Sequence, residues 1–155
     1  MRTIAIAGTI CGILDGISAI LLFGAMGATP AQVFQGIARG ALGRAALSGG
    51  TSAVVVGILA HFTVAFGAAA VYYAATRVRP KLNEHPVVFG PLYGACVHLF
   101  MSFVVIPLSA IGARPIVWST FLEVLAIHLV VVGPSISLTT AYSARSASSG
   151  AYERG

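Results

Sequence analysis

The sequence predicts an all-α fold: a four-helix transmembrane bundle with one amphipathic interfacial helix between the first and second spans. Two observations lead to this prediction. The chain has 155 residues, of which 57% are hydrophobic and only 8% are charged, whereas about 25% of the residues in soluble domains are charged. Its apolar residues also form four segments of about 20 residues, the length that crosses a bilayer. These segments fill most of the chain, so we expect a single domain.

The first span is expected over residues 4–26. Its apolar run is longer than the hydrophobic region of a signal peptide and contains Asp15, so we interpret it as a membrane span that the protein retains. The sequence Gly-Ala-Thr-Pro then ends the run. Thr29 is in the position of an N-cap, and Pro30 in that of the first residue of the next helix.

Residues 30–47 are too polar to span a membrane, and they predict an amphipathic helix that lies in the interface. On a helical wheel its polar face is formed by Gln32, Gln35 and Arg39. Its apolar face is formed by Val33, Ile37 and Ala41. Arg44 falls on the apolar side. Either the helix has ended before Arg44, or this side chain reaches a phosphate group or turns toward the bundle.

The other three spans are expected over residues 51–76, 87–110 and 117–142. Trp118 marks the membrane interface at the start of the last one, because tryptophan is enriched at that depth. Gly133 and Pro134 are expected to break this span. The serine-rich segment 143–155 has no hydrophobic periodicity, so we expect it to be disordered.

The distribution of lysine and arginine predicts the orientation in the membrane. With four spans, the two termini and the second connector share one side, which carries Arg2, Arg77, Arg79, Lys81, Arg145 and Arg154. The other side carries only Arg39, Arg44 and Arg114. The more basic side is expected to face the cytoplasm. The net charge of +5 is therefore a signal of topology and of contact with the lipid bilayer, and we do not expect nucleic acid as a partner.

Each predicted span carries one ionisable residue near its centre. These residues are Asp15, His61, His98 and His128. A charge at the bilayer centre costs about 2.5–3.5 kcal/mol, so such side chains face the bundle interior and mark functional sites. We therefore predict a polar site at the bilayer midplane, with His61 and His98 facing inward and Asp15 within reach of one of them.

Small residues at four-residue spacing accompany three of these polar residues. The rows are Gly8, Gly12 and Gly16; Gly57, His61 and Ala65; and Gly90, Gly94, His98 and Ser102. Such rows are where membrane helices approach closely. Glu123 is also a candidate for the site, although it lies about 140° around the helix from His128. It either caps an entrance or pairs with Arg114 or Arg44.

Several interpretations of the polar site stay open at this point. The side chains either hold the helices in register through hydrogen bonds, or form a path that moves or senses protons or a small ion. A bundle that holds haem or a metal ion is a further alternative, although no HxxxH or ExxH spacing supports it. The sequence indicates no cofactor directly, and the last alternative is a scaffold that binds lipid or protein partners. A four-span chain is slender for a transporter, which favours a homodimer.

Enzymatic catalysis is not indicated. The sequence has no GxSxG, P-loop or HExxH motif. The two cysteines, Cys11 and Cys96, both fall inside predicted spans and have no metal-binding spacing. We expect them to act as small apolar side chains.

Three stretches are similar to a known family. They are residues 37–50 (IARGALGRAALSGG), 61–73 (HFTVAFGAAAVYY) and 91–110 (PLYGACVHLFMSFVVIPLSA). With the first span and its aspartate, they resemble a family of small bacterial inner-membrane proteins that have about four spans and no established activity. The similarity covers most of the chain except the tail. It implies a place in the bacterial inner membrane, and it carries over no catalytic residue.

Overall fold

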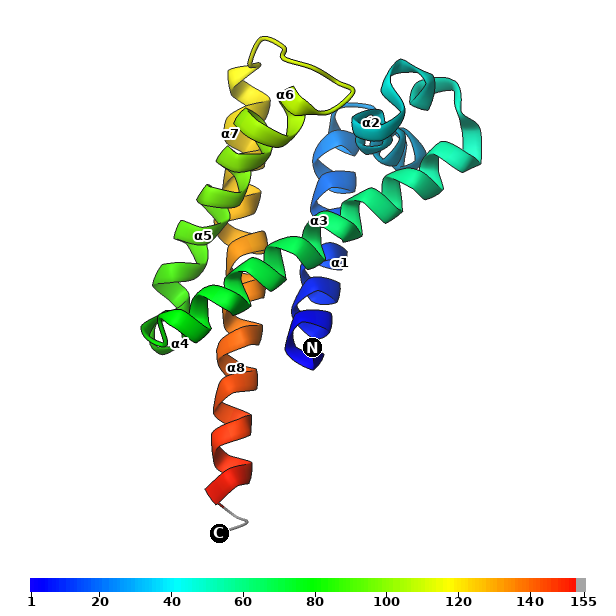
Figure 1. Cartoon of the computed structure of the whole chain (residues 1–155). Helices are drawn as coiled ribbons and strands as arrows, with labels where there is room; N and C mark the ends of the chain where they lie inside the picture. The colour runs from blue at the N-terminus through cyan, green and yellow to red at the C-terminus, as the bar shows by residue number, and fades with distance from the viewer. Residues whose placement is uncertain (153–155) are drawn as a thin grey trace.

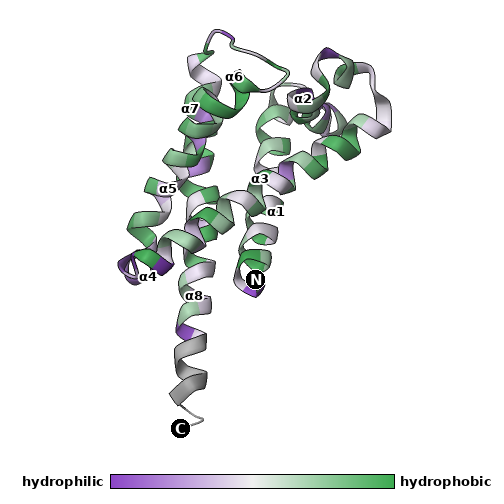
Figure 2. Ribbon diagram, viewed as in Figure 1, coloured by the Kyte–Doolittle hydropathy of each residue, from purple (hydrophilic) through white to green (hydrophobic). Residues whose placement is uncertain are grey.

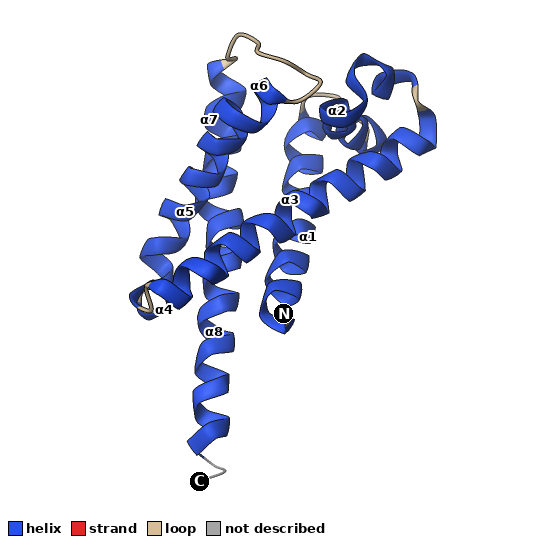
Figure 3. Ribbon diagram, viewed as in Figure 1, coloured by secondary structure: helices blue, strands red, loops and turns tan. Residues whose placement is uncertain are grey.

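The computed structural model describes the backbone of residues 1–152 and the side chains of residues 1–146. Within these residues the chain is helical and contains no strand (Figure 3). Four helices are long and apolar enough to cross a membrane: Arg2–Ala25, Gly50–Val78, Pro86–Leu108 and Trp118–Ser146. Figure 2 shows the hydrophobic colouring of these helices, with hydrophilic residues mostly near the ends of the bundle. The predicted all-α fold with four spans is confirmed.

The first half of the chain forms α1 (Arg2–Ala25), α2 (Pro30–Leu42), the 3₁₀-helical segment η1 (Gly43–Ser48) and α3 (Gly50–Val78). The second half forms α4 (Lys81–Glu84), α5 (Pro86–Phe100), α6 (Ile106–Leu108), α7 (Trp118–Ile127) and α8 (Gly133–Tyr152). Two π-helical segments, η2 (Met101–Val105) and η3 (His128–Val132), join α5 to α6 and α7 to α8.

Helix α1 lies at the centre of the packing. It contacts α3, α8 and η3, while α5 packs against α8 and η3 on the other side. In Figure 1, α3 runs obliquely to α1, α5 and α8. The start of α1 and the end of α8 lie at the same end of the bundle as α4, and α2 lies at the opposite end (Figure 1). Because the start of α1 and the end of α8 lie at one end of the bundle, the arrangement agrees with a chain that crosses the membrane an even number of times.

Glycines allow these helices to approach each other closely. A Cβ atom added to Gly57 of α3 would overlap the backbone of Phe34 in α2, and one added to Gly94 of α5 would overlap the carbonyl group of His128. In α1, Gly8 and Gly12 face phenylalanine rings of α3 in the same way. The small-residue rows therefore mark helix contacts, as we predicted.

Helix α2 begins as the sequence predicts. The Thr29 hydroxyl oxygen accepts a hydrogen bond from the Gln32 backbone N–H (3.3 Å), and the Gln32 side-chain oxygen accepts one from the Thr29 N–H (2.8 Å). This reciprocal pair is a capping box, with Pro30 as the first helical residue. Figure 1 shows α2 nearly end-on, so its axis runs across those of α1 and α8. Its place in the membrane interface remains a prediction.

The packed face of α2 differs from the predicted apolar face. Val33 is buried as expected, but the second buried residue is Ala38, while Ala41 is exposed. The reason is the close approach of Phe34 to Gly57, which turns the contact toward Ala38. Helix α2 ends at Leu42, before Arg44, so the first of the two alternatives for Arg44 is confirmed.

Two predictions for the last span are wrong. Gly133 and Pro134 do not break the helix, because the π-helical segment η3 directly precedes them. A wider turn accommodates the proline ring and its missing N–H. The helix also continues beyond residue 142 to Tyr152, since each added residue of an existing helix gains a backbone hydrogen bond. The predicted disorder of residues 153–155 lies outside the described residues.

Replacing Thr29 by alanine is expected to lower the free energy of unfolding by about 1 kcal/mol, because it removes one half of the capping box. Hydrogen exchange of the α2 amides in detergent measures the effect, which we expect to be largest in the first turn. Thr9→Ala is the control, because Thr9 is exposed and caps no helix. Equal exchange rates at α2 in the two variants would contradict the role of the capping box.

Candidate functional site

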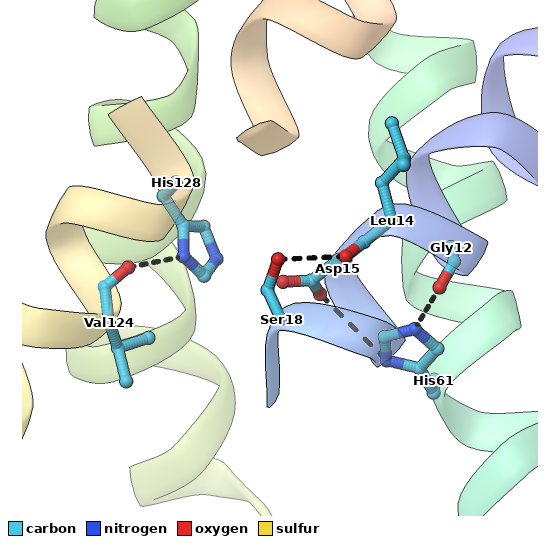
Figure 4. Close-up of polar contacts among 7 residues, drawn as sticks. All are labelled: Gly12, Leu14, Asp15, Ser18, His61, Val124 and His128. Atoms are coloured by element: carbon cyan, nitrogen blue, oxygen red, sulfur yellow. Dashed lines mark hydrogen bonds and ion pairs between the residues drawn. The ribbon is translucent and has the colours of Figure 1, made fainter. Parts of the chain in front are cut away.

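The four ionisable residues near the centres of the spans form two pairs. Asp15 of α1 faces His61 of α3, and His98 of α5 lies against His128 of η3. Figure 4 shows His128 on one side and the Asp15–His61 pair on the other, with α1 between α3 and η3. The expected inward orientation of His61 and His98 is confirmed, since their exposed fractions are 8% and 4%.

His61 is held by the backbone of α1. Its Nε2 lies 2.8 Å from the Gly12 carbonyl oxygen, and a carbonyl oxygen only accepts, so Nε2 carries a hydrogen. Gly16 lies beside the imidazole where it reaches this carbonyl. A Cβ atom at Gly16 would lie 3.4 Å from Nε2. The helix contact therefore fixes both the position and the tautomer of the ring.

The other ring nitrogen of His61 faces a carboxylate. Its Nδ1 lies 3.9 Å from Oδ2 of Asp15, whose side chain is 26% exposed. Because Nε2 already carries a hydrogen, a neutral His61 presents a lone pair at Nδ1. A lone pair and an ionised carboxylate repel each other, and one added proton, on either group, removes the repulsion. The pair is therefore suited to bind a single proton.

His128 uses one nitrogen for its own helix and leaves the other free. Its Nδ1 donates to the Val124 carbonyl oxygen at 2.9 Å. The Nε2 of a neutral His128 is therefore a hydrogen-bond acceptor. In Figure 4 this side of the ring points toward Asp15 and Ser18 on α1. Ser18 itself donates to the Leu14 carbonyl oxygen at 2.8 Å.

His98 is the most buried of the four residues. Its ring centroid lies 4.5 Å from that of Phe121 and 5.0 Å from that of His128. Within the described part of the chain its Nε2 is buried without a hydrogen-bond partner. A buried polar atom in this condition costs about 1–3 kcal/mol. A contribution to stability alone therefore does not explain a histidine at position 98.

Glu123 does not join these pairs. It is exposed on the outer side of α7, and among the described residues it forms no ion pair with Arg114 or Arg44. The five-residue separation from His128 explains this, because it turns the carboxylate away from the ring. Neither predicted role of Glu123 is supported by its position.

The predicted interfacial residues lie at the end of the bundle opposite the N-terminus. Arg39 is half-buried on α2, and its Nε has no hydrogen-bond partner among the described residues. Arg44 is exposed in η1. Trp118 is 64% exposed at the start of α7, and its ring lies edge-on to Phe121 at 5.6 Å. These positions suit side chains at a membrane surface.

The residues do not fit a metal ion. No three His, Cys, Asp or Glu side chains of the described residues come close enough together to hold one. The His98 and His128 rings are also in direct contact, with no space for a haem between them. Cys11 is buried and Cys96 is exposed, and neither is in a disulfide.

Two contributors to the site were not predicted. The Gly12 carbonyl oxygen orients His61, and Phe121 covers His98. A backbone acceptor has no signature in the sequence, although the row of glycines around Gly12 indicates that its carbonyl is accessible to another helix. Phe121 is one apolar residue among many in a span, and only the geometry separates it from the others.

No family model, curated protein or solved structure matches this chain. The resemblance to a family of small bacterial membrane proteins therefore remains a prediction.

Proposed function

We propose that this chain is a multi-pass integral membrane protein that binds protons at the bilayer midplane and moves them across the membrane. Its four long apolar helices are compatible with a multi-pass membrane protein. The observation that supports proton binding is the Asp15–His61 pair. One nitrogen of His61 is committed to Gly12, and the other lies 3.9 Å from the carboxylate, where one proton on either group would make the contact favourable.

A proton suits this pair better than a metal cation does. Hard cations such as Ca²⁺ and Mg²⁺ need about six or more oxygen ligands, and here a single carboxylate faces one imidazole. Imidazole titrates near neutral pH, and chains of carboxylates and histidines serve as proton relays within membranes. The sharing of one proton also keeps the pair free of net charge, which lowers its cost inside a membrane.

The proposal includes an orientation with both termini in the cytoplasm. The end of the bundle with the N-terminus and α4 carries more lysine and arginine than the end with α2, which supports this orientation. The resemblance to small bacterial membrane proteins supports the bacterial inner membrane as the location. A homodimer remains a prediction.

Proton flux into liposomes tests the proposal. The purified protein is reconstituted with a pH-sensitive dye inside the vesicles, and a potassium diffusion potential drives the flux. We expect the unmutated protein to conduct protons, and Asp15→Asn to reduce the flux about 100-fold. Asparagine keeps the shape of the side chain but cannot ionise.

Glu84→Gln is the matched control for this experiment. Glu84 is an exposed carboxylate on the short helix α4, outside the four long helices. We expect this variant to conduct as well as the unmutated protein. A flux equal to that of empty liposomes in the unmutated protein would refute proton transport.

A further inference from the structure

The contact between His98 and His128 has a role that the Asp15–His61 pair does not explain. We propose that these two histidines form a second proton-binding site, which passes its proton to Asp15. The inference rests on the proposed function and extends it to a defined path: from α5 to η3, and from η3 to α1.

Two complementary groups carry the first step. His98 is 4% exposed, and its Nε2 has no hydrogen-bond partner among the described residues. His128, whose ring centroid lies 5.0 Å away, has its Nδ1 hydrogen committed to Val124 and therefore offers a lone pair at Nε2. Once His98 is protonated, its Nε2–H is a donor without an acceptor, and the ring lies against an acceptor without a donor. The proposal requires the two rings to bring these nitrogens together from a centroid separation of 5.0 Å.

The step is balanced as a proton transfer. His98 takes up a proton from water and becomes an imidazolium with hydrogens on both nitrogens. Its Nε2–H bond then breaks, the electron pair stays on that nitrogen, and a new N–H bond forms at Nε2 of His128. His98 is again neutral and His128 carries the charge. Two like charges in contact repel each other, so the site holds one proton at a time.

Asp15 is the acceptor for the second step. Segment η3 packs against α1, and in Figure 4 the His128 ring points toward Asp15 and Ser18. Transfer of the Nε2 proton from the His128 imidazolium to the ionised carboxylate neutralises both groups. The proton then resides on the Asp15–His61 pair, in which Nδ1 of His61 lies 3.9 Å from Oδ2 of Asp15.

Few other titratable groups face this site. Of the elements packed against α5, η3 contributes His128 and α7 contributes Phe121, while Glu123 of α7 is exposed on the outer side. Cys96, on α5 itself, is also exposed. Helix α4 packs at the other end of α5, and the contacts of α8 with α5 near Gly90 come from proline and serine.

A π-helical segment lies next to each of the two rings. His128 is the first residue of η3, and η2 begins three residues after His98. Turns of π-helix occur frequently at functional sites, where they interrupt the regular hydrogen bonding of an α-helix. Each histidine therefore lies at or near a segment where the regular hydrogen bonding of the α-helix is already interrupted.

His98→Phe is the decisive variant. Phenylalanine keeps an aromatic ring against Phe121 and removes the unpartnered nitrogen, so we expect the melting temperature in detergent to stay the same or rise. The proton flux is expected to fall about 100-fold, because the ring no longer titrates. His98→Gln is the second variant, which keeps a polar group in case phenylalanine is too large for the site. His85→Gln, at an exposed histidine in the connector before α5, is expected to leave the flux unchanged.

The outcomes separate this inference from the proposed function. If Asp15→Asn abolishes the flux but His98→Phe and His98→Gln conduct normally, the second site is refuted and the proposed function stands. No flux in the unmutated protein refutes both. A loss of flux together with a large drop in melting temperature in both His98 variants would indicate a structural role and overturn the inference.

Nuclear magnetic resonance of ¹⁵N-labelled histidine gives a readout that does not depend on flux. We expect His128 to carry its hydrogen at Nδ1 at high pH. As the pH falls, His98 and His128 should take up one proton between them, and His98→Phe should change the titration of His128. Full and independent titration of both rings would overturn the inference.

Discussion

Replacing Gly94 by alanine is expected to lower the free energy of unfolding by about 3 kcal/mol, the upper end of the usual cost of overpacking. A Cβ atom at this position would overlap the carbonyl group of His128 and approach the backbone nitrogen of Gly133 at 3.2 Å. Backbone atoms cannot turn aside as a flexible side chain can. The added methyl group therefore forces α5 away from η3 and α8.

Gly67→Ala is the matched control for this prediction. Gly67 is exposed on α3, and a Cβ atom there would have no other atom within 4 Å. Alanine is a better helix former than glycine by about 1 kcal/mol, so we expect this variant to be slightly more stable. The stability of both variants is measured by unfolding in increasing concentrations of a denaturing detergent, with circular dichroism as the readout. Equal stabilities would contradict the close contact between α5 and α8.

Replacing His61 by alanine is expected to lower the free energy of unfolding by about 3–5 kcal/mol, the usual cost of truncating a large buried aromatic side chain to alanine. The variant loses the hydrogen bond to Gly12 and leaves Asp15 between the helices without its basic partner. It also leaves a cavity next to the rings of Phe34 and Phe62, which lie against His61. The same unfolding experiment measures the loss.

A double-mutant cycle identifies the part of this stability loss that comes from the interaction between Asp15 and His61. Adding Asp15→Ala to His61→Ala is expected to recover stability, because the carboxylate no longer lies unpaired between α1 and α3. His85→Ala is the control, since this histidine is exposed and outside the pair. Strictly additive effects of the two substitutions would show that Asp15 and His61 do not interact.

Local patterns in the sequence were sufficient to predict the four spans and the start of α2. Apolar runs of the length of a bilayer predict the four long helices, because each run is a property of its own segment. Thr29 and Pro30 likewise predict the start of α2, as its N-cap and its first helical residue. The rows of glycine predict close helix contacts, although they do not identify the partner helix.

The division of the site into two pairs could not be predicted. Four ionisable residues at similar depth suggest one cluster, but the order of the helices around the bundle decides which of them meet. Helix α1 packs between α3 and η3, so Asp15 meets His61, while His98 meets His128 on the other side. This order depends on contacts between segments that are distant in the sequence, so it cannot be predicted from any one segment.

The continuity of the last helix was missed for a different reason. Proline usually ends or bends a helix, and Pro134 follows a glycine. The π-helical turn before it accommodates the ring, and it forms where the backbone of His128 meets Gly94 of α5. A rule that considers only Gly133 and Pro134 therefore predicts a break that the packing removes.

The oblique course of α3 connects the Asp15–His61 pair to the thickness of the lipid bilayer. With 29 residues, this helix is about 44 Å long, while the hydrocarbon core of a bilayer is about 30 Å thick. Such a helix accommodates the mismatch by tilting, and the tilt increases as the membrane becomes thinner. Because His61 lies on α3 and Asp15 on α1, which α3 crosses obliquely (Figure 1), a change in the tilt of α3 alters the angle at which the two side chains meet. Lipids with shorter or longer acyl chains are therefore expected to change the geometry of this pair.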